Sequence, residues 1–322
     1  MVQERIKVGV IGVGHLGEYH VQKYQALPTA DLVGIVDTDA ARAQEISKRY
    51  EVPVFPHHDD LLRRVDAVSL AVPTEQHFEV AENVLEQGVH LLIEKPITYQ
   101  IEPADTLIVM AEKKNLVLQV GLVERFNPAV VGMESLLQDP VFIESHRMNV
   151  FTQRGTDVDV VLDLMIHDLD IILHVIASEV KEVHATGMCV ITGKTDIANV
   201  RMIFENGTVA NLTASRVSNK TLRKIRVFQP DAYLSVNCFK RELNVIRLDG
   251  PFKDLEGYPK LTSEKMEYPN SDPLEDQITS FVDSIIHDRQ PKVTGRDGRL
   301  ALKYALGIIE QIEKGCRNFQ II

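Results

Sequence analysis

The sequence predicts an α/β protein with two domains, an N-terminal doubly wound parallel sheet and a C-terminal α+β domain with a mostly antiparallel sheet. Its 322 residues exceed the usual size of one domain, and 44% hydrophobic with 25% charged residues is an ordinary globular composition. Apolar strand-like runs alternate with helical patterns up to Gly121, and strand-like runs then follow one another directly. We place the domains at 1–122 and 123–322, and the C-terminal helices can pack back on the first domain.

The strands of the first domain are almost entirely apolar, which indicates burial on both faces of a parallel sheet. The expected strands are Ile6–Ile11, Leu32–Asp37, Ala67–Val72, His90–Glu94 and Val117–Gly121, and the expected helices are His15–Ala26, Ala40–Tyr50, Glu75–Gln87 and Pro103–Asn115. This alternation is typical of a nucleotide-binding domain, whose ligand binds at the carboxyl ends of the strands.

The second domain begins with a helix, a strand and a long helix, expected at Asn127–Leu137, Val141–Val150 and Val158–Ile176. Strand-like runs follow at Val180–Val190, Asn199–Phe204, Thr208–Val217, Arg223–Phe228, Ala232–Asn237 and Leu243–Arg247, and turn signals separate several of them. We expect one face of the resulting sheet to pack on the helices of the domain. Residues 249–272 are expected to form a loop, and two helices close the chain, the second over 297–314.

Charge and cysteine content exclude several classes of protein. A formal net charge of −11 argues against general nucleic-acid binding, which requires a basic face. Cys189, Cys238 and Cys316 are widely spaced and odd in number, which indicates free thiols in a reducing compartment and neither disulfides nor a zinc site. The N-terminus has no apolar signal-peptide core, and no run is long enough to span a membrane. We therefore expect a cytoplasmic protein that does not bind membranes.

A glycine-rich loop between the first strand and the first helix predicts a dinucleotide site. In Gly12-Val13-Gly14-His15-Leu16-Gly17, the first glycine allows the tight turn, the second lets a pyrophosphate approach the backbone, and the third allows close packing of helix and strand. Asp37 ends the next strand and can accept hydrogen bonds from the adenosine ribose. Because this carboxylate would repel a 2′-phosphate and no arginine follows it directly, we expect NAD in preference to NADP.

Two later strand ends supply further candidates for the same cleft. Val72-Pro73-Thr74 follows the third strand and can line the nicotinamide side, while His77, one turn into the next helix, is equally consistent with a capping or solvent-facing histidine. The fourth strand runs into Glu94-Lys95-Pro96. Lys95 can donate to a substrate hydroxyl oxygen and stabilise the charge that develops on it as hydride leaves. Glu94 can pair with Lys95 or face the cofactor; a plain salt bridge at the strand end is the alternative.

The long helix of the second domain carries an acid and a histidine four residues apart. Asp163 and His167 therefore lie on one helix face, where the carboxylate can orient the imidazole and raise its basicity for acid–base catalysis. Asp170 and His174 extend the stripe, which raises the alternative of a metal site, but the sequence offers no distant partner ligand. We expect no metal; polar residues satisfied inside a packed core are the other alternative.

These motifs occur in one order along the chain: Gly12–Gly17, Asp37, Val72-Pro73-Thr74 with His77, Glu94-Lys95-Pro96, Gly121 with Arg125-Phe126-Asn127-Pro128, and Asp163 with His167. The set resembles the glucose–fructose oxidoreductase/inositol dehydrogenase (Gfo/Idh/MocA) family over essentially the whole chain. The resemblance implies NAD(P)-dependent hydride transfer at a sugar or polyol carbon, a Rossmann domain, and a second domain whose large open sheet is commonly an oligomer interface, here of a homodimer or homotetramer. By motif, Lys95, Asp163 and His167 correspond to the family's catalytic residues, and Arg125 and Asn127 are candidates for substrate binding.

Within the family, the segments around Asp163 and Arg216 resemble those of bacterial sugar-nucleotide dehydrogenases, notably those that oxidise UDP-N-acetylglucosamine at C3 for lipid A precursors. Arg125, Arg154 and Arg216 can supply forked donors for a pyrophosphate, although each is equally consistent with an ordinary ion pair. We keep two alternatives: an inositol or free-sugar dehydrogenase, and an NAD-sensing regulator without catalysis. The acid–base residues argue against the regulator.

Overall fold

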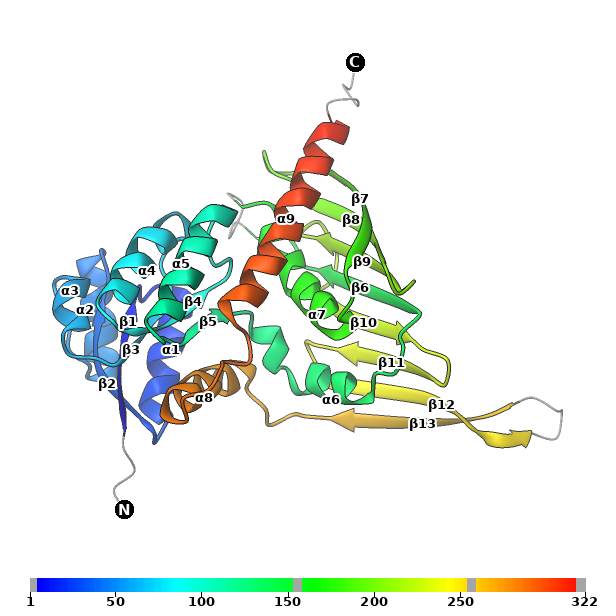
Figure 1. Ribbon diagram of the computed structural model, residues 1–322, viewed down its shortest axis with the longest axis horizontal. Coiled ribbons are helices and arrows are strands. Elements are labelled where there is room, and N and C mark those ends of the chain that lie inside the picture. The colour runs from blue at the N-terminus through cyan, green and yellow to red at the C-terminus, as the bar shows by residue number, and fades with distance from the viewer. Residues whose placement is uncertain (1–4, 153–157, 254–258, 317–322) are drawn as a thin grey trace. The chain divides into compact units, whose positions relative to one another are not determined.

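The computed structural model describes residues 5–152, 158–253 and 259–316, and these form two compact units (Figure 1). The described part of Met1–Val123 together with Asp272–Leu302 forms the first unit. The described parts of Glu124–Ser271 and Lys303–Ile322 form the second. Each unit is built on one sheet and has its own core.

The sheet of the first unit is parallel throughout, with strand order β2-β1-β3-β4-β5. Its strands are β1 (Ile6–Ile11), β2 (Ala30–Val36), β3 (Ala67–Leu70), β4 (His90–Glu94) and β5 (Leu118–Gly121). Its helices are α1 (His15–Ala26), α2 (Ala40–Tyr50), α3 (His58–Leu62), η1 (Thr74–Gln76), α4 (His77–Glu86), α5 (Ile101–Lys113), α8 (Pro273–Ile286) and the start of α9 (Gly295–Cys316). The predicted doubly wound sheet is confirmed.

Helices cover both faces of this sheet. Alternate residues of β1 point to opposite sides and so pack on different helices. Val8 and Val10 are fully buried in a cluster with Tyr24 of α1 and Phe281 of α8. On the other face, Gly9 packs on α3, where a side chain at Gly9 would collide with Leu61. Helix α8, late in the sequence, therefore contributes to the core of the first unit.

The second unit is built on an eight-stranded sheet of order β13-β12-β11-β10-β6-β9-β8-β7. All neighbours are antiparallel except β6 and β9, which are parallel. The strands are β6 (Phe142–Met148), β7 (Val180–Met188), β8 (Ile197–Phe204), β9 (Val209–Ser215), β10 (Leu222–Phe228), β11 (Ala232–Asn237), β12 (Glu242–Lys253) and β13 (Pro259–Glu267). The helical elements are η2 (Val123–Phe126), α6 (Pro128–Leu136), η3 (Val161–Met165), α7 (Ile166–Ile176) and the end of α9. The predicted mostly antiparallel sheet is confirmed.

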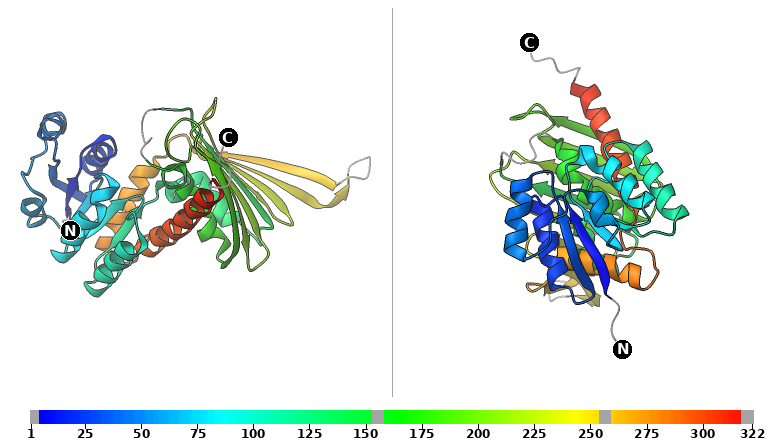
Figure 2. Two further views of the ribbon diagram at one scale, coloured as in Figure 1. Left: turned by 90° about the horizontal axis from the view of Figure 1, so that it is seen from above. Right: turned by 90° about the vertical axis from the view of Figure 1, so that its left-hand side faces the viewer.

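One face of this sheet packs on helices and the other is open (Figure 2, left). In β6, Ile143 and Arg147 are buried on the helix side, whereas Phe142 is only partly buried on the opposite side. There Phe142 stacks at a tilt on Phe228, whose ring lies 5.0 Å from that of Tyr233. An aromatic cluster therefore lies on the open face.

The structure differs from the expected local structure at three places. Much of the segment expected to be a loop, 249–272, is the end of β12 and all of β13, and these two strands pair at the edge of the sheet. The sequence did not indicate β13, because this strand buries almost no side chains and so shows no apolar alternation. The short helix α3 was not expected at all. The first turn of the expected long helix is a π-helix, η3.

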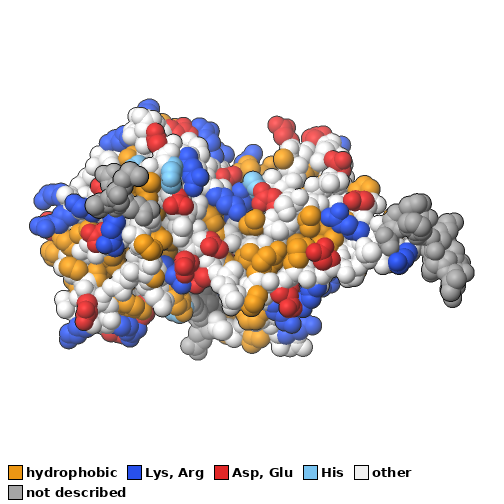
Figure 3. Space-filling view, turned by 90° about the horizontal axis from the view of Figure 1, so that it is seen from below, with side chains coloured by type: hydrophobic (Ala, Val, Ile, Leu, Met, Phe, Trp, Pro, Cys, Tyr) orange, Lys and Arg blue, Asp and Glu red, His pale blue; other side chains and the backbone are white. Residues whose placement is uncertain are grey.

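No helix in the described ranges is both long and apolar enough to cross a bilayer. On the face in Figure 3, Lys and Arg side chains lie among Asp and Glu side chains.

Candidate functional site

The glycine-rich loop connects β1 to α1 with the geometry that its three glycines predict. Gly12 has a φ of +83°, and a Cβ there would lie 2.8 Å from the Ala71 carbonyl. A Cβ on Gly17 would lie 1.9 Å from the Gly12 carbonyl oxygen. A Cβ on Gly14 would meet nothing within 4 Å. Two glycines therefore allow close packing, and the third leaves the loop surface open to an approaching ligand.

Helix α1 begins at this loop without a side-chain cap. Gly14 is its N-cap and supplies no side-chain hydrogen bond to the first turn. Gly14 and His15 are exposed and Leu16 is half-buried. The first N–H groups of a helix carry partial positive charge, so this uncapped end is suited to a pyrophosphate.

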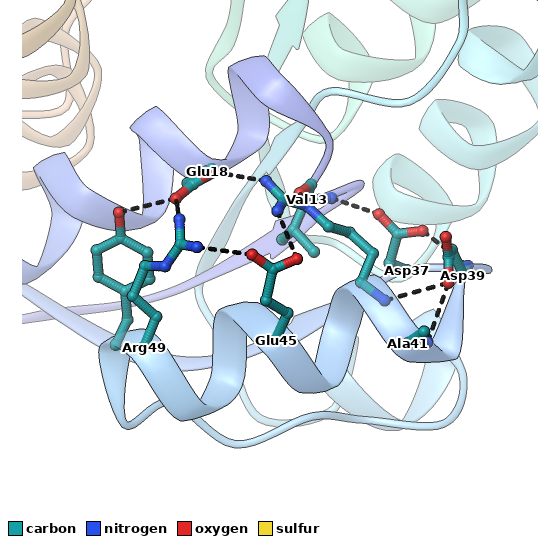
Figure 4. Close-up of polar contacts among 9 residues, drawn as sticks. Val13, Glu18, Asp37, Asp39, Ala41, Glu45 and Arg49 are labelled. Carbon is teal, nitrogen blue, oxygen red and sulfur yellow. Dashed lines mark hydrogen bonds and ion pairs between the residues drawn. The ribbon is translucent and has the colours of Figure 1, made fainter.

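Asp37 follows β2 and is fixed against the loop, as Figure 4 shows. Its Oδ2 accepts a hydrogen bond of 2.7 Å from the Val13 amide, and its Oδ1 accepts one of 2.8 Å from the Asp39 amide. A carboxylate can accept about four hydrogen bonds, so it retains capacity for two ribose hydroxyls. The loop, the uncapped helix end and the anchored acid fit a dinucleotide.

The turns after β3 and β4 are joined by His77. The ring places Nδ1 2.8 Å from the Pro96 carbonyl oxygen and Nε2 3.0 Å from the Val72 carbonyl oxygen. Burial lowers the pKa of His77, against the raising effect of the two carbonyls, so the ring is neutral at pH 7 and donates to one of them at a time. His77 is almost fully buried, while Pro73 is exposed and Val72 and Thr74 are half-buried. His77 therefore positions these turns and does not line a surface.

Lys95 follows a glutamate that is anchored in the core. Glu94 is buried, and its Oε1 lies 3.1 Å from Nε2 of His20 on α1. A Cβ on Gly121 would lie 2.5 Å from the same oxygen, so the glycine at the end of β5 leaves room for the carboxylate. Lys95 is half-buried, and its peptide bond to Pro96 is cis. The backbone that carries Lys95 is therefore fixed to α1.

Asp163 and His167 lie on one helical element of the second unit. Asp163 belongs to the π turn of η3 and His167 to the first turn of α7, and both are half-buried between buried apolar neighbours. Their spacing of four residues spans about one turn, so both side chains lie on one side of the helix. A π turn inside a helix often marks a functional site, because it re-aims the side chains of that turn. Lys95 belongs to the other unit.

Buried ion pairs hold the helix that carries His167. The guanidinium of Arg147 on β6 donates to both oxygens of Asp168, at 3.0 and 2.7 Å, and to Glu124 at 2.7 Å. All three side chains are less than a tenth exposed. Burial acts to raise the pKa of Glu124, but the charge and hydrogen bond of Arg147 outweigh it and hold that pKa below its usual value. The residue next to His167 is thereby tied to the sheet.

The other residues predicted to bind substrate are largely engaged inside the second unit. Arg125 is 2% exposed and donates to Asp170 at 3.1 Å. Asn127 caps α6 and also donates to Glu124 and to the Cys238 carbonyl. Arg216 is 5% exposed and bonds the Val158 carbonyl. Arg154 lies outside the described residues.

The polar residues that raised the alternative of a metal site make ion pairs with other side chains. Asp170 contacts Arg125, and Nε2 of His174 lies 2.7 Å from Glu134 at the surface. In the described ranges, a group of side chains of metal-ligand type occurs elsewhere, at His57, His58 and Asp59 at the start of α3.

Sequence reasoning missed the residues whose polar contacts position the candidate side chains within each unit: Glu18, His20, Arg42, Glu124, Arg147 and Asp168. A signal existed for two of them. Arg42 follows Asp37 by five residues, and Asp168 is adjacent to His167. The others depend on contacts between distant segments.

Comparison with known proteins identifies both halves of the chain. Residues 6–122 match a family described as oxidoreductases with an NAD-binding Rossmann fold, and residues 130–234 match the GFO/IDH/MocA C-terminal domain. The chain belongs to the Gfo/Idh/MocA family. As a family member with its nucleotide loop intact, it is an NAD(P)-dependent oxidoreductase that acts on CH–OH groups.

Two relatives cover nearly the whole chain. The UDP-N-acetylglucosamine 3-dehydrogenase of Acidithiobacillus ferrooxidans is 40% identical over 309 residues, which are 96% of this chain and 97% of that protein. A solved structure of that enzyme has a TM-score of 0.91, at 39% identity, covering 96% of this chain and 98% of that one. The apo scyllo-inositol dehydrogenase of Lactobacillus casei shares the fold, with a TM-score of 0.81 at 24% identity over 98% of both chains.

Proposed function

We propose that this protein is an NAD-dependent dehydrogenase of a nucleotide sugar, and that it oxidises the C3 hydroxyl of UDP-N-acetylglucosamine. The observation that carries the substrate is the 40% identity to a UDP-N-acetylglucosamine 3-dehydrogenase over 96% of the chain. The inositol dehydrogenase mentioned above is more distant, at 24% identity. A role in lipid A precursor synthesis is part of the same proposal.

The preference for NAD over NADP rests on Asp37. Its carboxylate is held beside Val13 by the loop amide, where it would accept hydrogen bonds from the ribose and repel a 2′-phosphate. The N-terminus of α1 and the open surface at Gly14 would hold the pyrophosphate. When bound, the nicotinamide ring supplies the acceptor for the hydride.

The proton chemistry is assigned to Lys95, Asp163 and His167. His167 takes the hydroxyl proton as general base, and Asp163 orients its ring from one turn earlier. Lys95 donates to the same oxygen and stabilises the charge that builds on it. The bonds broken are the C–H bond at C3, whose electron pair leaves as hydride, and the O–H bond, whose proton goes to His167; the products are the 3-keto sugar, a reduced cofactor and one proton.

The test is NADH formation across UDP-N-acetylglucosamine, UDP-glucose, glucose, myo-inositol and scyllo-inositol. We expect turnover with UDP-N-acetylglucosamine, and borodeuteride reduction of the product should place deuterium at C3 by NMR. Turnover of inositol or glucose with no response to UDP-sugars would refute the substrate, and deuterium at another carbon would refute the position.

We also propose that the open face of the eight-stranded sheet is covered by a second copy of the chain, in a homodimer or homotetramer. Its support is the aromatic cluster of Phe142, Phe228 and Tyr233 on that face. Phe228 is 38% exposed in the single chain, and large aromatic side chains are typical anchors of protein interfaces.

A further inference from the structure

Arg42 lies directly beside the part of the loop that is proposed to contact the adenosine ribose. Its Nε donates a hydrogen bond of 3.0 Å to the Val13 carbonyl oxygen, while the Val13 amide donates to Asp37. Two side chains of opposite charge, Arg42 and Asp37, therefore bind the carbonyl and the amide of Val13. A 2′-phosphate next to Asp37 would lie beside the loop residue that Arg42 also contacts.

The guanidinium of Arg42 is, however, occupied by two glutamates. Nη2 lies 2.5 Å from Glu18 of α1, and Nη1 lies 2.9 Å from Glu45, one turn along α2. Arg49 binds both glutamates as well, and the Tyr50 hydroxyl donates to Glu18 at 3.2 Å. Two arginines and two glutamates form a network of zero net charge.

Glu18 is the stronger of the two partners. Its side chain is 18% exposed, against 50% for Glu45, so its ion pair with Arg42 is screened less by solvent. Burial acts to raise the pKa of Glu18, but hydrogen bonds from Arg42, Arg49 and Tyr50 outweigh it and hold the pKa below its usual value. Glu18 is therefore ionised throughout the neutral range, and Arg42 is engaged at every working pH.

We propose that Arg42 is a latent cation for the 2′-phosphate of NADP, and that Glu18, with Glu45, excludes NADP by occupying it. This rests on the proposed cofactor site at the Gly loop and Asp37. Cofactor selectivity then has two parts: Asp37 repels the phosphate, and Glu18 withholds the guanidinium that would bind it. A phosphate needs the forked N–H groups that now face the glutamates.

The experiment compares NADPH and NADH affinity, by nicotinamide fluorescence titration, in Asp37→Ser and in Asp37→Ser/Glu18→Gln. One new charge-assisted bond to the phosphate should tighten NADPH binding by about tenfold or more in the double variant, with NADH binding little changed. Adding Arg42→Ala to the double variant should abolish the gain. The gain should also shrink at high salt, because it depends on an exposed ion pair.

Two controls separate this mechanism from a simple change of charge. Arg49→Gln alters the same network without releasing Arg42, so it should give no gain in NADPH affinity. If Glu18→Gln fails to fold, Glu45→Gln releases Nη1 at a half-exposed position and should give a smaller gain that also requires Arg42.

Two results would overturn the proposal: no gain on releasing Arg42, or a gain that persists after Arg42→Ala. The cofactor assignment itself is read separately, from the wild-type protein. Wild type that binds NADPH more tightly than NADH would refute the NAD preference, whatever the variants show.

Discussion

Replacing Arg147 with methionine should destabilise the second unit more than any surface substitution. Both oxygens of Asp168 bind this guanidinium, so the variant leaves a buried carboxylate without its ion-pair partner. Glu124 loses its 2.7 Å bond but keeps Asn127 and the more distant Arg223, at 3.6 Å. Breaking a buried pair on one side costs about 3–5 kcal/mol, so we expect a loss near the middle of that range. At 4 kcal/mol the folding equilibrium falls by roughly a thousandfold.

The pH dependence of this loss tests its cause. In the wild type, the lowered pKa of Glu124 means that its stabilising contribution is present above the unfolded value and is lost as pH falls. In Arg147→Met, burial without the cation raises the pKa of Glu124, so the destabilisation is relieved as pH falls and this carboxyl takes up a proton. The gap in unfolding free energy between the two proteins should therefore narrow from pH 7.5 to pH 5.

Urea unfolding followed by far-ultraviolet circular dichroism gives the free energies, at one fixed protein concentration. Amide hydrogen exchange should locate the loss of protection in β6 and α7. The matched control is Arg226→Met, which breaks the pair with Glu144 at 2.9 Å on the partly exposed side of the sheet and should cost less than about 1 kcal/mol. Equal losses in the two variants, or a gap that does not change with pH, would refute the reasoning.

Three other outcomes are expected. His167→Ala should lower kcat by roughly 10²–10⁴-fold and remove a neutral-range ionisation from the pH profile of kcat/KM. Asp163→Asn should lower kcat less. A near-normal kcat and an unchanged pH profile in His167→Ala would leave Lys95 as the base. Asp196 accepts hydrogen bonds from the backbone amides of Val190, Ile191 and Thr192, which outweigh the effect of its burial and lower its pKa from 3.8 to about 2. Its contribution of about 2 kcal/mol to stability should therefore be present above pH 4 and lost between pH 4 and 2. Acid unfolding of Asp196→Asn that matches that of the wild type would contradict this. Phe228→Glu should reduce the mass in light scattering to that of one chain, and a monomeric wild type would refute the sheet interface.

The Rossmann unit was predictable because its signals are local. Gly12 and Gly17 are required by contacts that the loop makes with itself and with Ala71, and this close approach appears in the sequence as fixed glycine spacing. The apolar runs of the strands follow from burial on both faces. The same reasoning failed for β13, because an exposed edge strand is held by backbone pairing with β12 and needs no apolar alternation.

The supporting residues of the site could not be predicted because their partners are distant in sequence. His20 meets Glu94 across 74 residues, and Arg147 meets Asp168 across 21. Each is an ordinary polar residue in its own segment, and only the fold gives it a partner. Arg125 shows a different case: a motif makes it a candidate for substrate binding, and the structure adds a buried contact with Asp170 that the motif does not predict.

Lys95 and His167 share one arrangement, in which an immediate neighbour in sequence is anchored. Glu94 is buried against His20, and the half-buried Lys95 follows it. Asp168 is bound by Arg147, and the half-buried His167 precedes it. Fixing a neighbour fixes the backbone of the reactive residue. A positioned acid–base group needs a fixed backbone, because catalysis depends on holding the group within hydrogen-bond reach of the reacting oxygen.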